Sequence, residues 1–133
     1  MRAQRRHVIF DGTGKSLVNT CGRVIGRMHG AGYRVVIVVV LASVERCWQR
    51  IEARRVATDR AVPHGVLSAT VRDLQRAVPV YIEGPRAGLC EATYVLVNEA
   101  DGDALEVSVI DKGTPASERA AAAARAAELL KLD

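Results

Sequence analysis

The chain has 133 residues, of which 49% are hydrophobic, enough to bury one core and to exclude a chain that is disordered throughout. Its net charge of +4 comes almost wholly from arginine and favours contact with an anion such as a phosphate, a nucleotide or nucleic acid. Three widely spaced cysteines without a CxxC pair argue against a disulfide framework and a zinc site. The longest apolar run, Val35 to Ala42, is too short to cross a bilayer, and no signal-peptide core precedes it. We therefore expect a cytoplasmic protein.

The first part of the chain reads as a strand, a helix and a second strand. Residues 7–10 are mostly apolar and lead into the glycine-containing loop 11–14, which predicts a strand and a sharp turn. Apolar residues at helical spacing over 17–28 predict a helix that stops at the glycines of 30–32. The unbroken apolar run 35–41 is typical of a strand buried on both faces. Together these elements predict a right-handed parallel crossover.

Three further helices and two further strands are expected. Ser43 is a candidate N-cap for a helix whose buried side would carry Val44, Cys47, Trp48 and Ile51. The other elements are a helix over about 65–77, strands at 93–97 and 105–110 joined by the turn 101–103, and an alanine-rich helix over 115–132. Aromatic residues are scarce, and a core of Val, Leu, Ile and Ala suits a parallel sheet covered by helices. Residues 1–133 are therefore predicted to form a single α/β unit.

The loop from Asp11 to Ser16 contains Gly-Lys-Ser after a predicted strand, yet its spacing does not fit a Walker A loop. That motif needs a glycine five residues before Gly14, where the chain has Ile9. A loop this short offers too few successive backbone N–H groups to wrap a β-phosphate. Two interpretations remain: an ordinary strand-to-helix turn, or a substrate-binding strand end at which Asp11 and Thr13 offer a carboxylate and a hydroxyl to a sugar or another alcohol.

Arginines crowd the segment after the second predicted strand. Arg46, Arg50 and Arg54 repeat every four residues along one helix, and Arg55 and Arg60 follow. Like charges at this spacing destabilise a helix unless they face an anion or an acidic partner. A solvated helix face is one interpretation. The other is a cluster that stabilises the charge of a phosphoryl group during its transfer.

The order of these features resembles the zeta-toxin family of P-loop kinases, over about residues 7–78. The resemblance rests on the strand-end Asp11-Gly12-Thr13-Gly14, the Gly32-Tyr33-Arg34-Val35 segment before a valine-rich strand, the pair Arg50 and Arg54, and the series Arg60-Ala61-Val62-Pro63. It implies a P-loop kinase-like α/β fold, here a partial parallel sheet with flanking helices that lacks the first strand and the Walker A loop.

The resemblance also implies an activity. The family phosphorylates sugar nucleotides of the UDP-N-acetylglucosamine type with ATP and Mg²⁺, and related kinases act on other small alcohols. Asp11 and Thr13 fall where the family holds the sugar nucleotide, and Arg50, Arg54 and Arg60 fall where lid arginines contact the ATP phosphates, with Arg50 and Arg60 as the nucleotide-binding pair. The family's ATP loop, Mg²⁺-binding hydroxyl and catalytic base lie upstream of the matching strand. We therefore expect a kinase portion that is inactive without that segment, in a toxin–antitoxin setting.

Other functions stay open at this point. A non-catalytic remnant that binds a nucleotide or a partner protein is the main alternative, and a basic RNA-binding domain is a weaker one because no nucleic-acid motif appears. The histidines His7, His29 and His64 lack metal-ligand spacing, so no metal site is predicted. A sheet without its central strand would expose an apolar edge, which predicts self-association, an antitoxin or a complementing chain.

Overall fold

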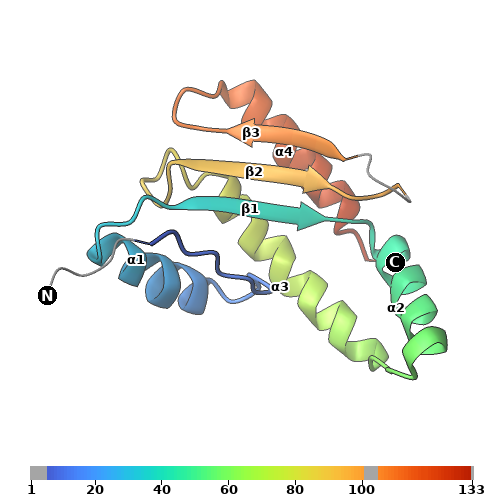
Figure 1. Ribbon diagram of the computed structural model, residues 1–133. Helices are drawn as coiled ribbons and strands as arrows, with labels where there is room; N and C mark the ends of the chain where they lie inside the picture. Colours follow the sequence, from blue (N-terminus) through green and yellow to red (C-terminus); the bar gives the residue numbers. More distant parts are fainter. Residues whose placement is uncertain (1–5, 101–104, 133) are drawn as a thin grey trace, which may run out of the picture.

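A computed structural model describes residues 6–100 and 105–132, so the predicted turn at 101–103 lies outside the described residues. In chain order the elements are the π-helix η1 (Val18–Ile25), α1 (Gly26–Gly30), β1 (Val36–Leu41), α2 (Val44–Thr58), α3 (His64–Ile82), β2 (Ala92–Val97), β3 (Glu106–Ile110) and α4 (Ala116–Leu129). Figure 1 shows α3 and α4 behind one three-stranded sheet, α1 below it and α2 beyond the end of β1. The predicted α/β class is confirmed.

The sheet is mixed, with strand order β1-β2-β3. β1 and β2 are parallel, with Val36 opposite Ala92 and Leu41 opposite Val97. β2 and β3 are antiparallel, so the prediction of a wholly parallel sheet is wrong for β3. A parallel return needs a crossover of a dozen or more residues, and the connection from Val97 to Glu106 is shorter than that.

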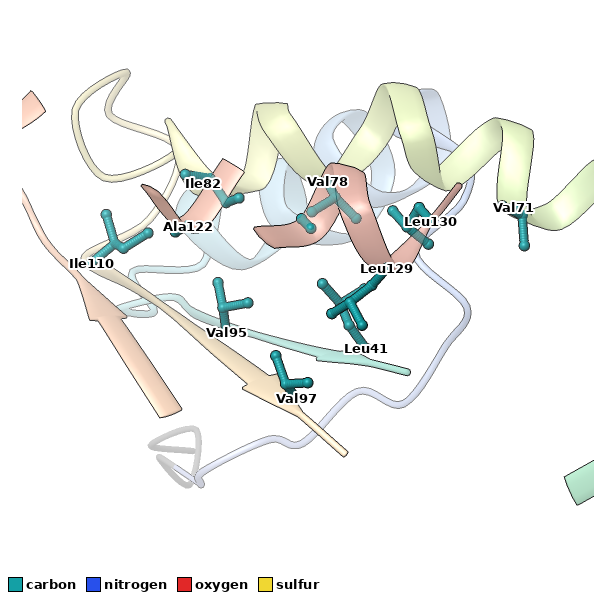
Figure 2. Close-up of a cluster of buried hydrophobic side chains, with 11 residues drawn as sticks. Leu41, Val71, Val78, Ile82, Val95, Val97, Ile110, Ala122, Leu129 and Leu130 are labelled. Carbon is teal, nitrogen blue, oxygen red and sulfur yellow. The ribbon is translucent and has the colours of Figure 1, made fainter. Parts of the chain in front are cut away.

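The core lies on one face of this sheet, under α3 and α4. Figure 2 shows the buried side chains that meet there: Leu41, Val71, Val78, Ile82, Val95, Val97, Ile110, Ala122, Leu129 and Leu130. α3 has the spacing of an amphipathic helix, and α4 supplies small alanines that let the two helices approach each other and the sheet. Gln75 of α3 donates a hydrogen bond of 2.7 Å to the Leu130 carbonyl, which joins the end of α4 to α3.

The opposite face of the sheet is open in the described part of the chain. Val36, Val38 and Val40 are 50%, 57% and 60% exposed. Their neighbours on the same face, Tyr94, Val107 and Val109, are also exposed. The expectation that the 35–41 run is buried on both faces is therefore wrong, because helices cover only the side that carries Val39 and Leu41. The apolar run predicts that both faces of β1 are buried, whereas the described helices bury only one face.

Residues 7–10 do not form a strand, which corrects a second prediction. The segment lies beside the free edge of β1, and no ladder hydrogen bond joins the two among the described residues. Residues that favour β-structure form a strand only when a neighbouring strand supplies backbone hydrogen bonds. The predicted strand–helix–strand crossover thus has its helix and its second strand, without the first strand.

The helices differ from prediction mainly at their ends. The helix predicted over 17–28 is present as η1 and α1. It ends at Gly30, and Gly32 just beyond it has φ of +84°, a conformation that favours glycine. The Ser43 cap is confirmed, since its hydroxyl accepts a 3.1 Å hydrogen bond from the Arg46 N–H. α3 runs five residues further than expected, through Pro79 to Ile82, because Val78 and Ile82 are buried against the sheet. No helix in the described ranges is long and apolar enough to cross a membrane.

Candidate functional site

A groove runs along the free edge of β1 and has a volume of about 380 Å³. One wall is β1 itself, and the other includes Val8 and Phe10 of the N-terminal segment. The floor is apolar and comes from η1, α1 and α3, with Ile25, Met28, Leu74, Val78 and Tyr81 among the lining residues. The predicted substrate loop, Asp11 to Gly14, also lines this groove.

The loop from Asp11 to Gly14 is fixed by Tyr81. The Tyr81 hydroxyl donates a 2.5 Å hydrogen bond to the Gly14 carbonyl, and Gly14 has φ of +65°, a conformation that favours glycine. Burial raises the pKa of Tyr81, so its hydroxyl keeps the proton that it donates. Asp11 and Thr13 themselves are exposed. The structure therefore presents both predicted substrate residues to solvent on an anchored loop.

Of the three arginines predicted to contact phosphates, Arg50 is anchored, whereas Arg54 and Arg60 extend into solvent. The Arg50 guanidinium donates 2.8 Å and 3.4 Å hydrogen bonds to the main-chain oxygen and Oδ1 of Asn98, at the carboxyl end of β2. Asn98 in turn donates a 2.7 Å bond from its N–H to the Leu41 carbonyl. Arg54 and Arg60 are exposed, and neither guanidinium makes a hydrogen bond or an ion pair within the part of the chain that the structure describes.

The structure does not bring the two predicted groups into one pocket. The groove that contains Asp11 and Thr13 is lined by neither Arg50, Arg54 nor Arg60. Figure 1 shows α2, which carries Arg50 and Arg54, beyond the carboxyl end of β1 and away from the N-terminal segment. The loop lines the groove at the free edge of β1, whereas α2 lies beyond the carboxyl end of that strand, the end at which open α/β sheets bind ligands.

Sequence reasoning missed the residues that support this region. Glu99 accepts a hydrogen bond from the Ser43 N–H, which ties the end of β2 to the start of α2. This hydrogen bond holds the pKa of Glu99 below its ordinary value of 4.5. Asn98 and Glu99 directly follow the predicted strand 93–97, and polar residues at a strand end are the sequence feature that could have identified them. No sequence pattern marked Tyr81, which lies within an apolar helix face.

The residues that follow the loop, Lys15 and Ser16, have the contacts of an ordinary turn. Lys15 is exposed, and the Ser16 hydroxyl accepts a 3.3 Å bond from the Asn19 N–H, so both act as ordinary residues of a turn before η1. The Gly14 carbonyl accepts the hydrogen bond from the Tyr81 hydroxyl. Across residues 6–100 and 105–132, no three His, Cys, Asp or Glu side chains gather in a manner that could hold a metal ion.

Comparison with known proteins gives one match. The family model described as Zeta toxin matches residues 1–83, a range that contains Asp11, Thr13 and the three arginines. Neither a curated protein nor a solved structure matches the chain. Because the matched range covers more than half of the 133 residues, the chain belongs to the zeta-toxin family and is a relative of its P-loop kinases.

Proposed function

We propose that this chain supplies the acceptor-binding and phosphate-binding residues of a kinase that transfers a phosphoryl group from ATP to a sugar nucleotide of the UDP-N-acetylglucosamine type, or to another small alcohol. The observation that carries the proposal is the family match, because it spans both the Asp11–Gly14 loop and the arginines Arg50, Arg54 and Arg60. The anchored loop and the exposed arginines described above supply the chemistry.

Asp11 and Thr13 are proposed to bind the acceptor. A carboxylate accepts hydrogen bonds from two sugar hydroxyls, and a threonine hydroxyl donates to one oxygen and accepts from another. The bond from Tyr81 to the Gly14 carbonyl holds this loop in place before the acceptor arrives. Such preorganisation lowers the entropic cost of placing the acceptor hydroxyl for attack.

Arg50, Arg54 and Arg60 are proposed to contact the ATP phosphates, and Arg50 and Arg60 to form the main nucleotide-binding pair. Guanidinium groups pair with phosphate oxygens and stabilise the charge that spreads over them during transfer. The bonds from Arg50 to Asn98 leave part of its guanidinium available, while Arg54 and Arg60 have their whole side chains available. ATP would bring Mg²⁺ with it, and the described residues provide no complete ligand set for that ion.

The test is isothermal titration of the full chain with UDP-N-acetylglucosamine in moderate salt. We expect binding that Asp11→Asn and Thr13→Ala each weaken about tenfold or more, the loss of one good hydrogen bond to a charged or hydroxyl group. Asp59→Asn, which removes an exposed carboxylate at the end of α2, should leave the affinity unchanged. Equal affinities in all four proteins, or no binding to the unmodified chain, would contradict the proposed acceptor site.

Titration with ATP and Mg²⁺ tests the phosphate-binding part separately. We expect weak binding that Arg54→Gln and Arg60→Gln reduce, and no phosphoryl transfer by the 133-residue chain alone, because Gly12 to Ser16 is too short to wrap a β-phosphate. Phosphorylated sugar nucleotide in a reaction with the chain alone would overturn the second expectation.

The open apolar face of the sheet favours a second candidate, a non-catalytic unit that binds a partner protein. Val36, Val38, Val40, Val107 and Val109 expose apolar surface that isolated proteins rarely leave in water as one patch. Failure of both titrations together with tight binding to a protein partner would favour this candidate over the kinase.

A further inference from the structure

Asn98, the first residue after β2, joins the carboxyl end of the sheet to α2. Its N–H donates a 2.7 Å hydrogen bond to the Leu41 carbonyl at the end of β1. Its main-chain oxygen and its Oδ1 accept the 2.8 Å and 3.4 Å bonds from one nitrogen of Arg50, Nη2. Both residues are half-buried. Asn98 is therefore fixed to β1 and in turn fixes the Arg50 guanidinium.

This contact holds Arg50 without neutralising its charge. Both acceptors are uncharged amide oxygens. Arg55 and Arg125 pair with glutamates, whereas Arg50 pairs with no carboxylate among the described residues. In the same part of the chain, the Nε–H and Nη1 donors of Arg50 have no partner. A positive charge with unused donors is therefore held in one place.

A guanidinium that is already held binds an anion at a lower entropic cost than a free one. Arg54 extends into solvent and must give up rotamer freedom when it contacts a phosphate, whereas Arg50 has lost much of that freedom in the fold. The contact also lies at the carboxyl ends of the parallel strands β1 and β2, where open α/β sheets bind ligands. Arg50 is thus the preorganised member of the proposed phosphate-binding arginines.

We infer that Asn98 is a positioning residue of the proposed kinase site, which holds the Arg50 guanidinium, with its charge intact, for contact with an ATP phosphate. The inference rests on the phosphate-binding role proposed above for Arg50. Asn98 lies beyond residues 1–83, so the family match assigns it no role. The part of the chain outside the matched range thus supports a binding residue inside it.

The test is isothermal titration of the full chain and its variants with ATP and Mg²⁺. Asn98→Ala removes the Oδ1 acceptor and should weaken ATP binding about threefold to tenfold, because the ligand must then order the guanidinium. Asn98→Asp keeps the shape but places a carboxylate against Arg50, and it should weaken ATP binding at least about tenfold. Asn19→Asp makes the same exchange at an exposed position of η1 and should bind ATP as the unmodified chain does.

Stability and a double variant separate positioning from a purely structural role. Aspartate at position 98 would form an ion pair with Arg50, so Asn98→Asp should unfold at the same urea concentration as the unmodified chain or at a higher one. A purely structural role would make ATP affinity follow this stability. In an Arg50→Gln background, Asn98→Ala should have no further effect on ATP affinity, because its effect passes through the guanidinium.

Three results would overturn the inference. Equal ATP affinities of the unmodified chain, Asn98→Ala and Asn98→Asp would show that Arg50 does not depend on Asn98, and would leave the proposed phosphate contacts intact. Equal losses from Asn98→Ala with and without Arg50→Gln would show that Asn98 affects ATP by another route. Absence of ATP binding to the unmodified chain would remove the proposed phosphate contacts together with the inference.

Discussion

Arg50 and Arg54 lie one helical turn apart on α2, yet only the Arg50 side chain bonds to another element of the fold. Its guanidinium satisfies the Asn98 carbonyl at the carboxyl end of β2, whereas Arg54 extends into solvent. We expect Arg50→Gln to lower the free energy of unfolding by about 1 kcal/mol, the usual net value of such a hydrogen bond. Arg54→Gln should stay within about 0.5 kcal/mol of the unmodified chain. Urea denaturation measures both.

Both substitutions should weaken ATP binding if the arginines contact phosphates. Stability and binding therefore separate: Arg54→Gln is expected to lose affinity without losing stability. A large stability loss in Arg54→Gln, or none in Arg50→Gln, would contradict the contacts seen around Asn98.

Glu99 makes the stability of the chain depend on pH. The hydrogen bond from the Ser43 N–H holds the pKa of Glu99 below 4.5 in the folded state, while the unfolded chain keeps the ordinary value. The unfolded state thus binds more protons, and this contribution is present above about pH 4.5 and is lost as the pH falls through the lower, folded pKa. Glu99→Gln should remove this part of the acid sensitivity. Thermal unfolding between pH 3 and pH 6 measures it, and parallel curves for the two proteins would contradict the assignment.

Gly84 occupies a tight position between α3 and β2. A Cβ added there would lie 2.9 Å from both the Cys90 sulfur and the Tyr81 carbonyl oxygen. Gly84→Ala should therefore lower the free energy of unfolding by about 1–3 kcal/mol, the range for an overpacked core. Gly65, near the start of α3, has no atom within 4 Å of such a Cβ, so Gly65→Ala should be neutral or stabilising by up to about 1 kcal/mol. Denaturation midpoints that rank the two variants in the reverse order would contradict this packing.

At the scale of elements, the sequence predicted most of the helices and strands and failed where a neighbour decides the outcome. The cap at Ser43 and the strands near Thr93 and Val107 depend on local residues, and all appear. The 7–10 strand and the two-sided burial of β1 depend on a pairing strand and a covering layer. The local sequence pattern predicts neither the pairing strand nor the covering layer, because an apolar run shows only that its side chains favour burial.

The candidate site followed the same rule. Residue type and position relative to a strand predict a binding role for Asp11, Thr13 and the arginines, and that role stays a prediction. Tyr81 was not predictable, because its bond to Gly14 joins residues 67 positions apart. The sequence also did not predict that the loop and the arginines lie apart, because spacing along the chain does not give the direction in which α2 leaves the sheet.

Pro79 interrupts the hydrogen-bond ladder of α3. It lies inside α3, where it lacks the N–H that would bond the Gln75 carbonyl, and the helix nevertheless continues to Ile82. Burial of Val78 and Ile82 against the sheet offsets that loss. Pro79→Ala should raise the free energy of unfolding by about 1–3 kcal/mol, since proline costs about 3 kcal/mol in a helix interior. Val80→Ala, at an exposed neighbour, serves as the control. A Pro79→Ala variant no more stable than the unmodified chain would show that the missing hydrogen bond does not destabilise α3.

At the scale of the whole molecule, helices cover one face of the sheet and leave the other face exposed among the described residues. α3 and α4 cover the inner face, whereas the outer face presents three exposed valines of β1 next to Val107 and Val109 of β3. Apolar surface of this kind is expected to bind another surface wherever one is available. In a purified sample, the only other surface available to this face belongs to another copy of the chain.

We therefore expect the purified chain to self-associate in a concentration-dependent manner, with a mass above 14.3 kDa in sedimentation velocity. The double variant Val36→Lys and Val109→Lys places two charges on the outer face and should sediment as a monomer, because each lysine would have to be desolvated in the association. The matched control, Val18→Lys and Val56→Lys, adds the same charge at valines that are 74% and 75% exposed on η1 and α2, and it should associate like the unmodified chain. If the unmodified chain is monomeric at every concentration, the outer face does not drive association. If both double variants become monomeric, net charge controls association and the sheet face does not.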